Sequence, residues 1–411
     1  MFKLAWASIR ARRWTVGLVW LALMASVLLL LTSDRLKTAT QEGFNRSING
    51  VDLIISTKTG QLESVLYSVF HVGQPIANID ADNVAALKQN SDIEWAIPIA
   101  LGDSHGEFRV IATEGEYFDR LKDARNQAMR FAQGAVFEGP TEVVIGAQVA
   151  SKLNYRVGQS IYLSHGSDTL ARAHDDLAFK IVGILAPTGT PNDQSLFVSL
   201  PAYSLLHVGW INGSRILSLD KFDLSVLPPL ESVTAVFVGL KNPLKLFRLA
   251  RAINEDDRNL MSAVIPGVAL AQLWSIVDRI SSVFDLLGGV IIAVSLLGIL
   301  AVTLTALDAR QREMSILRAC GATPFQLSQL VIAEALLISI SAAAVAFALA
   351  NMGSWLLADW LAREFAITSE PRLWLPQEWL LMGAVVASTL LISLIPAIRV
   401  FRLNLKYGLQ S

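Results

Sequence analysis

The stretch at residues 308–337, "DARQREMSILRACGATPFQLSQLVIAEALL", places a short charged segment between two long apolar runs. Residues 308–319 are good helix formers, and Gly321 is suited to end a helix. The residues that follow have the pattern of a helix start, with an N-cap, a proline at the first helical position and a capping-box glutamine: Thr323, Pro324 and Gln326. The stretch therefore predicts a short helix, a turn and the beginning of a long apolar helix.

Apolar runs long enough to cross a bilayer lie on both sides of this stretch. A helical span needs about 20 residues. The chain is 53% hydrophobic and only 17% charged, and soluble domains are typically about 25% charged. The first run is interpreted as an uncleaved anchor, because no small-x-small cleavage site follows it. We expect four transmembrane helices, at residues 14–32, 285–307, 327–358 and 379–398.

Lysine and arginine residues gather in the N-terminal segment, in the loop after the second span and in the C-terminal tail. With four crossings these three segments share one side, and the positive-inside rule makes that side the cytoplasm. The sequence thus predicts a multi-pass protein of the cell (inner, cytoplasmic) membrane with both termini cytoplasmic. Its segments outside the bilayer would be a cytoplasmic N-terminal segment, a cytoplasmic helix, an external loop and a cytoplasmic tail, at residues 1–13, 308–326, 359–378 and 399–411.

The long segment at residues 33–284, between the first and second spans, predicts a large extracytoplasmic α/β (α+β) domain. Short β-branched runs bounded by turn residues predict strands at 51–56, 142–146, 160–164, 179–185 and 233–240. Helical patterns lie at 81–89, 146–153 and 243–253. The polar segment at 165–178 is expected to be a solvent-facing loop. Because glycine and proline are absent next to the spans, the first two transmembrane helices should continue into this domain as stalk helices.

Several chemistries are disfavoured by the sequence. There is no Gly-Lys dipeptide, so the chain lacks a Walker A loop and should not itself be an ATPase or carry a cofactor. The net charge of -1 argues against a nucleic-acid partner. No two histidines have i, i+4 spacing, which favours ordinary surface or turn histidines over a metal site; they are His71, His105, His165, His174 and His207.

Two further features allow more than one interpretation. Glu334 is a charge inside the third predicted span, where insertion costs about 2.5–3.5 kcal/mol. Its role is either that of a polar anchor that holds the short cytoplasmic helix by hydrogen bonds, which the family resemblance given below favours, or that of an ion or proton relay. The aromatic stretch "ESVLYSVFHVG" at residues 63–73 is expected to pack in the core, with a binding surface as the alternative.

Residues 310–337 resemble the signature of the FtsX-like permease domain of MacB-type ABC transporters, which would cover residues 285–411. The shared pattern is an Arg-x-x-Glu-hydrophobic helix, an arginine before a Gly-Ala-Thr turn, and a span with an early glutamate. The runs "EVVIGAQVASKLNYRVGQSIYLSHG" (142–166) and "FKIVGILAPTGTPNDQSLFVSL" (179–200) resemble the MacB periplasmic core domain. The resemblance therefore extends over both halves of the chain.

In this family the short cytoplasmic helix is a coupling helix that docks on an ABC ATPase subunit, and that subunit binds the ATP. The resemblance assigns this role to Arg310, Arg312, Glu313, Met314, Leu317, Arg318 and Gly321. An interfacial helix with arginines reaching to lipid headgroups is the alternative. The implied partners are the ATPase, a second permease copy or homologue, and membrane lipid, with a periplasmic adaptor or substrate protein left open.

Two functions fit these expectations. The first is the permease subunit of an ABC complex that uses mechanotransmission to export or extract an apolar or peptide/lipid-like cargo. The second is a non-transport regulatory or sensor protein that controls an extracytoplasmic partner. In both, the stalk helices pass motion from the cytoplasmic side to the external domain.

Overall fold

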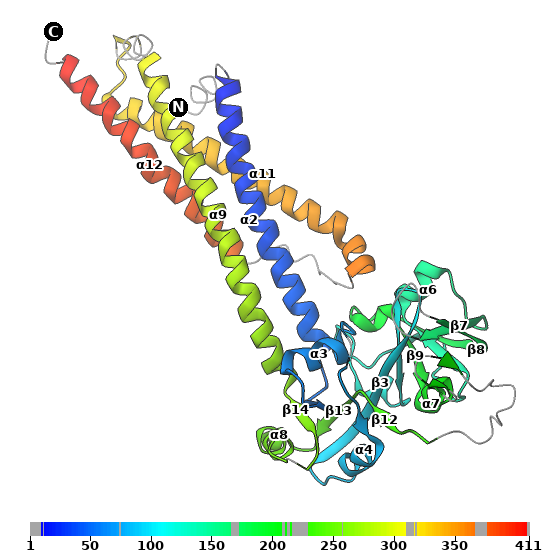
Figure 1. The fold of residues 1–411 in the computed structure, drawn as a ribbon. Helices are drawn as coiled ribbons and strands as arrows, with labels where there is room; N and C mark the ends of the chain where they lie inside the picture. The colour runs from blue at the N-terminus through cyan, green and yellow to red at the C-terminus, as the bar shows by residue number, and fades with distance from the viewer. Residues whose placement is uncertain are drawn as a thin grey trace. The chain divides into compact units, whose positions relative to one another are not determined.

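The computed structural model describes residues 10, 12–73, 75–165, 172–207, 210–211, 214–215, 229–256, 258–309, 316, 319–365 and 376–408. The chain forms two compact units (Figure 1). The helical unit comprises Met1–Thr38, Val277–Asp359 and Glu370–Ser411, and the inserted unit comprises Ala39–Ile276 and Trp360–Ser369.

The helical unit is built from four long helices: α2 (Arg13–Ser47), α9 (Pro266–Ala309), α11 (Pro324–Phe365) and α12 (Pro376–Gly408). Each contains one of the four predicted spans, and each is long and apolar enough to cross a membrane. The mixed α/β segment lies between the first and second of them in the chain. This confirms the predicted fold class.

Helices α2 and α9 extend well beyond the predicted spans. Helix α2 is continuous to Ser47, and α9 already begins at Pro266, so both predicted stalk helices are present. Lys37 of α2 and Asp278 of α9 form an ion pair at 2.8 Å. A Cβ atom added at Gly288 of α9 would lie 2.3 Å from Cδ2 of Leu30 on α2, so this glycine permits a close approach of the two helices.

The core of the helical unit contains a row of small residues on α11. Ala335, Ala342, Ala346 and Ala350 are all buried and pack in one cluster with Leu23 and Val27 of α2 and Leu296 of α9. Small side chains let helices approach closely in a membrane, where van der Waals packing holds them together. The alanine-rich sequence of the third span is thus the site of its contact with α2 and α9.

The inserted unit contains a ten-stranded sheet in the order β14-β1-β13-β3-β4-β9-β6-β8-β5, with β7 paired to β3 and β8. Most pairs are antiparallel, whereas β4/β9 and β6/β8 are parallel. The strands are β1 (Leu53–Thr57), β3 (Ile93–His105), β4 (Phe108–Thr113), β5 (Phe131–Gly134), β6 (Glu142–Ile145), β7 (Ser160–His165), β8 (Arg172–Leu185), β9 (Ser195–Ser199), β13 (Ala235–Leu240) and β14 (Met261–Val264). Two short pairs stand apart: β2 (Ile79–Asp80) with β12 (Ser232–Val233), and β10 (Trp210–Ile211) with β11 (Ser214–Arg215).

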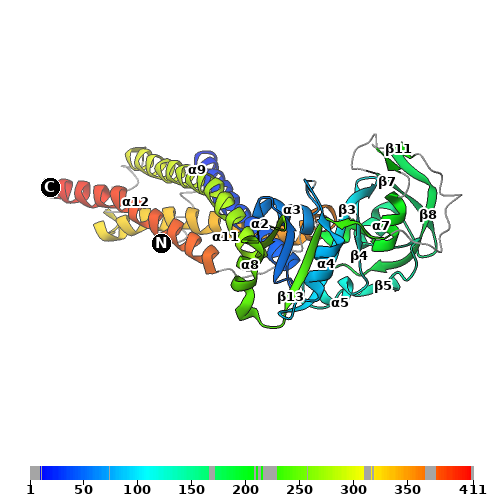
Figure 2. The same ribbon diagram turned by 60° about the horizontal axis from the view of Figure 1, so that its bottom comes forward.

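Side chains alternate between two hydrophobic clusters along these strands, as expected for a sheet covered on both faces. In β1, Leu53 and Ile55 belong to one cluster and Ile54 to the other. Helices that contribute to the first cluster are α4 (Ala81–Lys88), α6 (Ala147–Leu153), α7 (Leu200–His207) and α8 (Leu246–Asn254). Those of the second are α3 (Gln61–Val69), α5 (Tyr117–Arg120) and the start of α9. Figure 2 shows α4 and α7 against the sheet.

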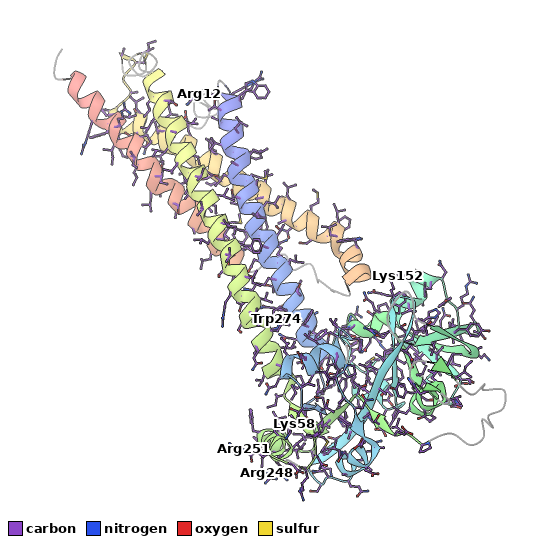
Figure 3. All side chains as sticks on the ribbon, viewed as in Figure 1. Arg12, Lys58, Lys152, Arg248, Arg251 and Trp274 are labelled. Atoms are coloured by element: carbon purple, nitrogen blue, oxygen red, sulfur yellow. The ribbon has the colours of Figure 1, made fainter. Side chains whose placement is uncertain are left out.

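The aromatic stretch at 63–73 forms most of α3 and packs as predicted. Tyr67 is buried, and Phe70 stacks on Phe44 of α2 with ring centroids 4.1 Å apart. Phe44 in turn meets Trp274 of α9 edge to face, with ring centroids 5.5 Å apart. Figure 3 labels Trp274 on α9. The cluster ties both stalk helices to α3 within the inserted unit.

One predicted loop is wrong in part. Strand β8 begins at Arg172, so residues 172–178 of the expected 165–178 loop belong to a strand; Arg172, Ala173 and Ala178 pair with β7, with a register shift between them. The hydrogen bonds between strands are made by backbone groups, which every residue except proline has in full. A polar segment can therefore form a strand when a neighbouring strand is available to pair with it. Residues 166–171 lie outside the described residues.

Candidate functional site

The turn before α11 has the predicted geometry. Gly321 has φ +95°, a left-handed conformation that glycine adopts without strain. The Thr323 amide donates to Oε1 of Gln326 at 2.9 Å, and the Gln326 amide donates to Oγ1 of Thr323 at 3.3 Å. These two bonds form a reciprocal capping box. They fix the direction in which α11 leaves the turn.

Most of the residues assigned to ATPase coupling lie outside the described residues: Arg310, Arg312, Glu313, Met314, Leu317 and Arg318. Of the assigned set, the structure places Gly321 in the turn itself. Ile316 and Phe325, on either side of the turn, are 63% exposed apolar side chains. Phe325 was not singled out from the sequence, although an aromatic residue directly after the helix-start proline was a visible signal. The coupling role stays a prediction.

Glu334 lies on α11 and is buried. Its Oε2 is 3.3 Å from Nη2 of Arg12, the residue just before α2 (Figure 3). The Nη1 of the same arginine donates to the carbonyl of Val302 on α9 at 3.3 Å. The position of Glu334 as a buried charge with a polar partner agrees with an anchor. That it also holds the coupling helix stays a prediction, because that helix lies outside the described residues.

A second buried ion pair was not anticipated from the sequence. Arg35 of α2 donates from Nε and Nη2 to the two carboxylate oxygens of Glu378 on α12, at 2.5 and 2.9 Å. Its Nη1 donates to Oγ of Ser354 on α11 at 3.2 Å, and the guanidinium lies over the Phe347 ring at 5.7 Å. The signal was available, because Arg35 and Glu378 have opposite charges just beyond predicted spans and on the same predicted side.

Several buried hydroxyl groups in the helical unit donate to backbone carbonyls. Ser26, Ser295 and Thr389 each donate to the carbonyl four residues earlier, at 2.7–2.9 Å. Ser328 donates both to its own helix and to the carbonyl of Ala397 on α12, each at 3.0 Å. Their donor groups are therefore used inside the bundle, in helix-to-backbone bonds.

Three of the five histidines have described side chains. His105 Nδ1 donates to the Tyr162 carbonyl at 2.7 Å, which leaves Nε2 to accept from the Tyr155 hydroxyl at 2.9 Å. His71 Nδ1 lies 3.2 Å from Ser195 Oγ, and His207 Nδ1 donates to the Tyr203 carbonyl at 2.8 Å. The side chains of His165 and His174 lie outside the described set. Within the residues that the structure describes, no group of three or more metal-ligating side chains is found.

The expectation that the chain lacks a Gly-x-Ser-x-Gly motif is wrong, because this pattern occurs as "GDSHG" at residues 102–106. In hydrolases this pattern forms a sharp turn between a strand and a helix, with the serine exposed. Here it runs from β3 into the turn before β4, and Ser104 is buried within the strand. The local fold therefore does not make it a nucleophile elbow.

Comparisons with known proteins match both parts of the chain. Residues 15–254 match the MacB-like periplasmic core domain, and residues 286–405 match the FtsX-like permease C-terminal domain. The chain is similar to the periplasmic region of MacB from Actinobacillus actinomycetemcomitans at 11% identity and a TM-score of 0.34, covering 55% of this chain and 95% of that one. It is also similar to the extracellular domain of the noncanonic ABC-type transporter YknZ from Gram-positive bacteria at 12% identity and a TM-score of 0.30, covering 52% and 98%. Comparison with curated proteins gives no match.

Proposed function

Because the chain belongs to the MacB/FtsX-type family of ABC transporter permeases, we propose that it passes the motion of a separate ATPase subunit to the inserted unit. Permeases of this family work with an ABC ATPase partner. The outcome of this mechanotransmission would be export or extraction of an apolar or peptide/lipid-like cargo. The ATP would be bound by the partner, which docks on the coupling helix.

The observation that carries this proposal is the continuity of α2. This helix runs unbroken from Arg13 to Ser47. Arg12 precedes its first residue and contacts α11 and α9, Arg35 contacts α12 and α11, and Phe44 packs in the inserted unit. A helix transmits displacement along its axis because its backbone hydrogen bonds hold each turn to the next. A shift at the start of α11 would therefore act on α2 through Glu334 and reach Phe44.

The docking surface for the ATPase would lie at the turn between α9 and α11. The exposed Ile316 and Phe325 supply apolar anchors there, and the arginines and Glu313 of the coupling helix would fix the register. The side of the membrane is part of the proposal: by the positive-inside rule, this turn would lie in the cytoplasm and the inserted unit on the other side of the inner membrane.

A mechanical role also agrees with the interior of the helical unit. The cluster of α2, α9 and α11 is apolar, and the hydroxyl groups described above donate to backbone carbonyls. Lining an aqueous path requires polar groups that face a cavity. The packing is better suited to helices that move as bodies than to a polar solute crossing between them.

The decisive experiment uses two coupling-helix variants, Arg312→Glu combined with Glu313→Arg, and separately Leu317→Asp. We expect both variants to reach the membrane at normal abundance and topology but to lose co-purification with the ATPase, or its coupling to activity. Arg279→Glu, on α9 away from this turn, is the matched control and should keep the ATPase. Normal ATPase binding and full activity in both coupling-helix variants would refute the docking proposal.

The orientation can be tested with an impermeant thiol reagent. Cys320 is exposed beside the turn and is the single cysteine of the chain. We expect it to stay unlabelled on intact spheroplasts, whereas an Ala86→Cys, Cys320→Ser variant, with the new thiol on an exposed position of α4, should react. The reverse pattern would invert the topology. Cargo release from vesicles containing the complex would support transport, and activation of an external partner without cargo movement would favour the regulatory alternative.

A further inference from the structure

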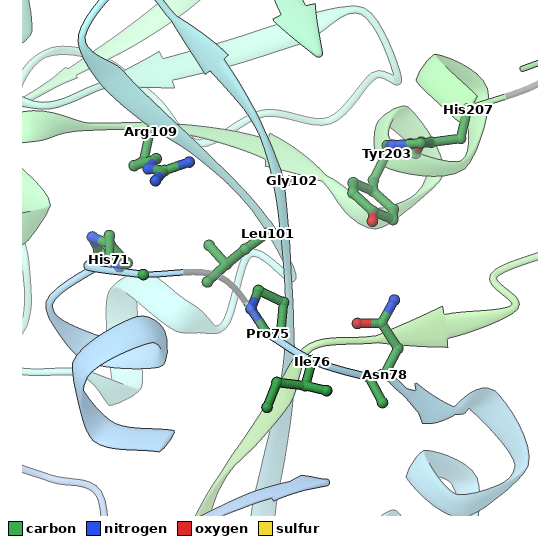
Figure 4. Close-up of a pocket in the computed structure, with 11 residues that line it drawn as sticks. His71, Pro75, Ile76, Asn78, Leu101, Gly102, Arg109, Tyr203 and His207 are labelled. Atoms are coloured by element: carbon green, nitrogen blue, oxygen red, sulfur yellow. The ribbon is translucent and has the colours of Figure 1, made fainter. Parts of the chain in front are cut away.

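The inserted unit contains a cavity of about 440 Å³ that the coupling mechanism does not use. The segment after α3 forms one wall with Pro75 and Ile76, and β3 and β4 contribute Leu101 and Arg109. Tyr203 from α7 completes the lining (Figure 4). Its volume is within the range of small-molecule sites, which is about 300–1,000 Å³.

Arg109 is a half-buried cation in this lining. Among the described residues its guanidinium forms no ion pair and no hydrogen bond. The adjacent acid Glu107 instead pairs with Lys152, at 3.5 Å. A partly desolvated charge is costly unless something pairs with it. The cavity thus presents a positive group that has no partner among the residues that the structure describes.

The neighbouring histidine adds no charge. Burial, together with the positive charge of Arg109, lowers the pKa of His71 to about 4, so the imidazole is neutral near pH 7. Its Nδ1 is 3.2 Å from Ser195 Oγ, and its backbone has φ +57°. His71 therefore lines the cavity beside the Arg109 guanidinium as an uncharged side chain in contact with Ser195.

Further polar groups lie across the cavity from Arg109. Figure 4 shows the Tyr203 hydroxyl and the Asn78 amide on the side opposite Arg109 and His71, with Leu101 and Pro75 between. Burial, assisted by the nearby Asp103 carboxylate, raises the pKa of Tyr203 to about 12, so the phenol keeps its proton and can donate. Asp103 also lies 4.0 Å from Nε2 of His207, and its negative charge disfavours a doubly charged ligand in this cavity.

We propose that this cavity binds a monoanionic carboxylate with an apolar substituent, such as the free C-terminus of a peptide. Arg109 would hold the carboxylate in a charge-assisted pair. The apolar substituent would lie against Leu101 and against Ile76, whose side chain is 82% exposed. Tyr203 and Asn78 would donate to a ligand carbonyl. The proposal depends on this cavity alone and goes beyond the transport function.

The test is calorimetric titration of the full chain in lipid nanodiscs, without the ATPase, so its outcome is separate from that of the coupling proposal. The probes are N-acetyl-leucine, which carries the carboxylate, its neutral amide N-acetyl-leucinamide, and inorganic phosphate. We expect N-acetyl-leucine to bind and the other two to bind at least tenfold more weakly. Binding of the amide as tightly as the acid, tighter binding of phosphate, or no binding of the acid at millimolar concentrations would overturn the proposal.

Variants locate the binding. Arg109→Gln should weaken binding of N-acetyl-leucine by about ten- to a hundredfold, as expected for a lost charge-assisted bond. Arg156→Gln removes the same charge from an exposed position outside the cavity lining and should leave affinity unchanged. Because Arg109 has no partner among the described side chains, its replacement should not lower the thermal midpoint. Tyr203→Phe, which keeps the ring, should weaken binding several-fold. Unchanged affinity in both cavity variants would contradict the assignment.

Discussion

The two ends of the helical unit contain ion pairs that differ in distance, burial and number of hydrogen bonds. At Arg35 the guanidinium binds both oxygens of Glu378, and the two side chains are 10% and 0% exposed. At Arg12 one nitrogen reaches one oxygen of Glu334 at 3.3 Å, and the side chains are 25% and 8% exposed. Both arginines flank the span of α2, so this helix has a bidentate, deeply buried pair at its tight end and a longer, more exposed pair at its loose end.

The difference indicates which end can move. A buried bidentate pair holds its geometry because both partners would be left desolvated if it opened. The longer and more exposed contact between Arg12 and Glu334 costs less to rearrange. The loosely held end adjoins the turn where the ATPase is proposed to dock, and the tightly held end leads into the stalk. If the ATPase docks as proposed, such an arrangement would pass a displacement from the loosely held end of α2 to the tightly held end.

The largest effect is expected at the tight end. Glu378→Gln or Arg35→Gln leaves a buried charge unpaired, which should destabilise the fold by about 3–5 kcal/mol. Thermal unfolding of the purified chain in nanodiscs would measure this. The double variant Arg35→Met with Glu378→Leu removes both charges and should recover most of the stability. If the single variants unfold like the wild type, the tight end is not held by this pair.

The packing beside the tight end gives the next largest effect. Gly288→Ala would place a methyl group within 2.3 Å of Leu30 Cδ2, and the overpacking should cost about 1–3 kcal/mol. Gly289→Ala is the matched control, because nothing lies within 4 Å of its added Cβ. In the same thermal unfolding measurement, the Gly288→Ala variant should therefore have a lower midpoint than the Gly289→Ala variant. Equal midpoints would show that α2 and α9 can move apart freely here.

A smaller effect is expected at the loose end. Glu334→Gln keeps an oxygen that accepts from Arg12, whereas Glu334→Leu leaves the guanidinium without this partner. We expect the Gln variant to retain most ATPase-coupled activity and the Leu variant to lose it, with a stability cost of about 1–3 kcal/mol. Equal loss of activity in both variants would instead favour a titrating role for Glu334.

The capping box should give the smallest effect. Thr323→Ala removes one reciprocal bond at the start of α11, at a cost of about 1 kcal/mol. Thr323→Ser retains the hydroxyl and serves as the control. The stimulated ATPase rate of the assembled complex is the appropriate measurement, because the turn adjoins the proposed docking surface. A reduced rate in both variants would point to the threonine methyl group rather than to the cap.

Local sequence patterns were sufficient for the helical unit. The absence of glycine and proline predicted the continuation of α2 and α9, and the Thr-Pro-x-Gln pattern predicted the capping box, because both depend on residues close together in the chain. The ion pairs could not be derived in this way. Arg12 and Glu334 are separated by 322 positions, and their contact depends on how α2, α9 and α11 pack.

The inserted unit shows the same limit for strands. Strand β3 is central to the sheet but was not predicted, because Pro98 and Gly102 interrupt its β pattern. The strand is stabilised by its pairing with β13 and β4, which cannot be recognised from its own residues. The cavity that contains Arg109 could likewise not be predicted from the sequence, because the residues that line it come from segments distant in the chain. The aromatic stretch at 63–73 was correctly assigned to the core, but His71 at its end also forms part of that cavity.

The spacing of the two arginines on α2 has a consequence for the lipid environment. Arg12 and Arg35 are 23 positions apart, which corresponds to about 35 Å along a helix. The hydrocarbon core of a typical bilayer is about 30 Å thick. The two arginines would therefore make the helical unit sensitive to bilayer thickness. In a thicker bilayer, the more exposed Arg12–Glu334 ion pair would enter the hydrocarbon and break before the better shielded Arg35–Glu378 ion pair does. The acyl-chain length of the surrounding lipid should accordingly change the stability of the Arg12–Glu334 contact more than that of the Arg35–Glu378 contact.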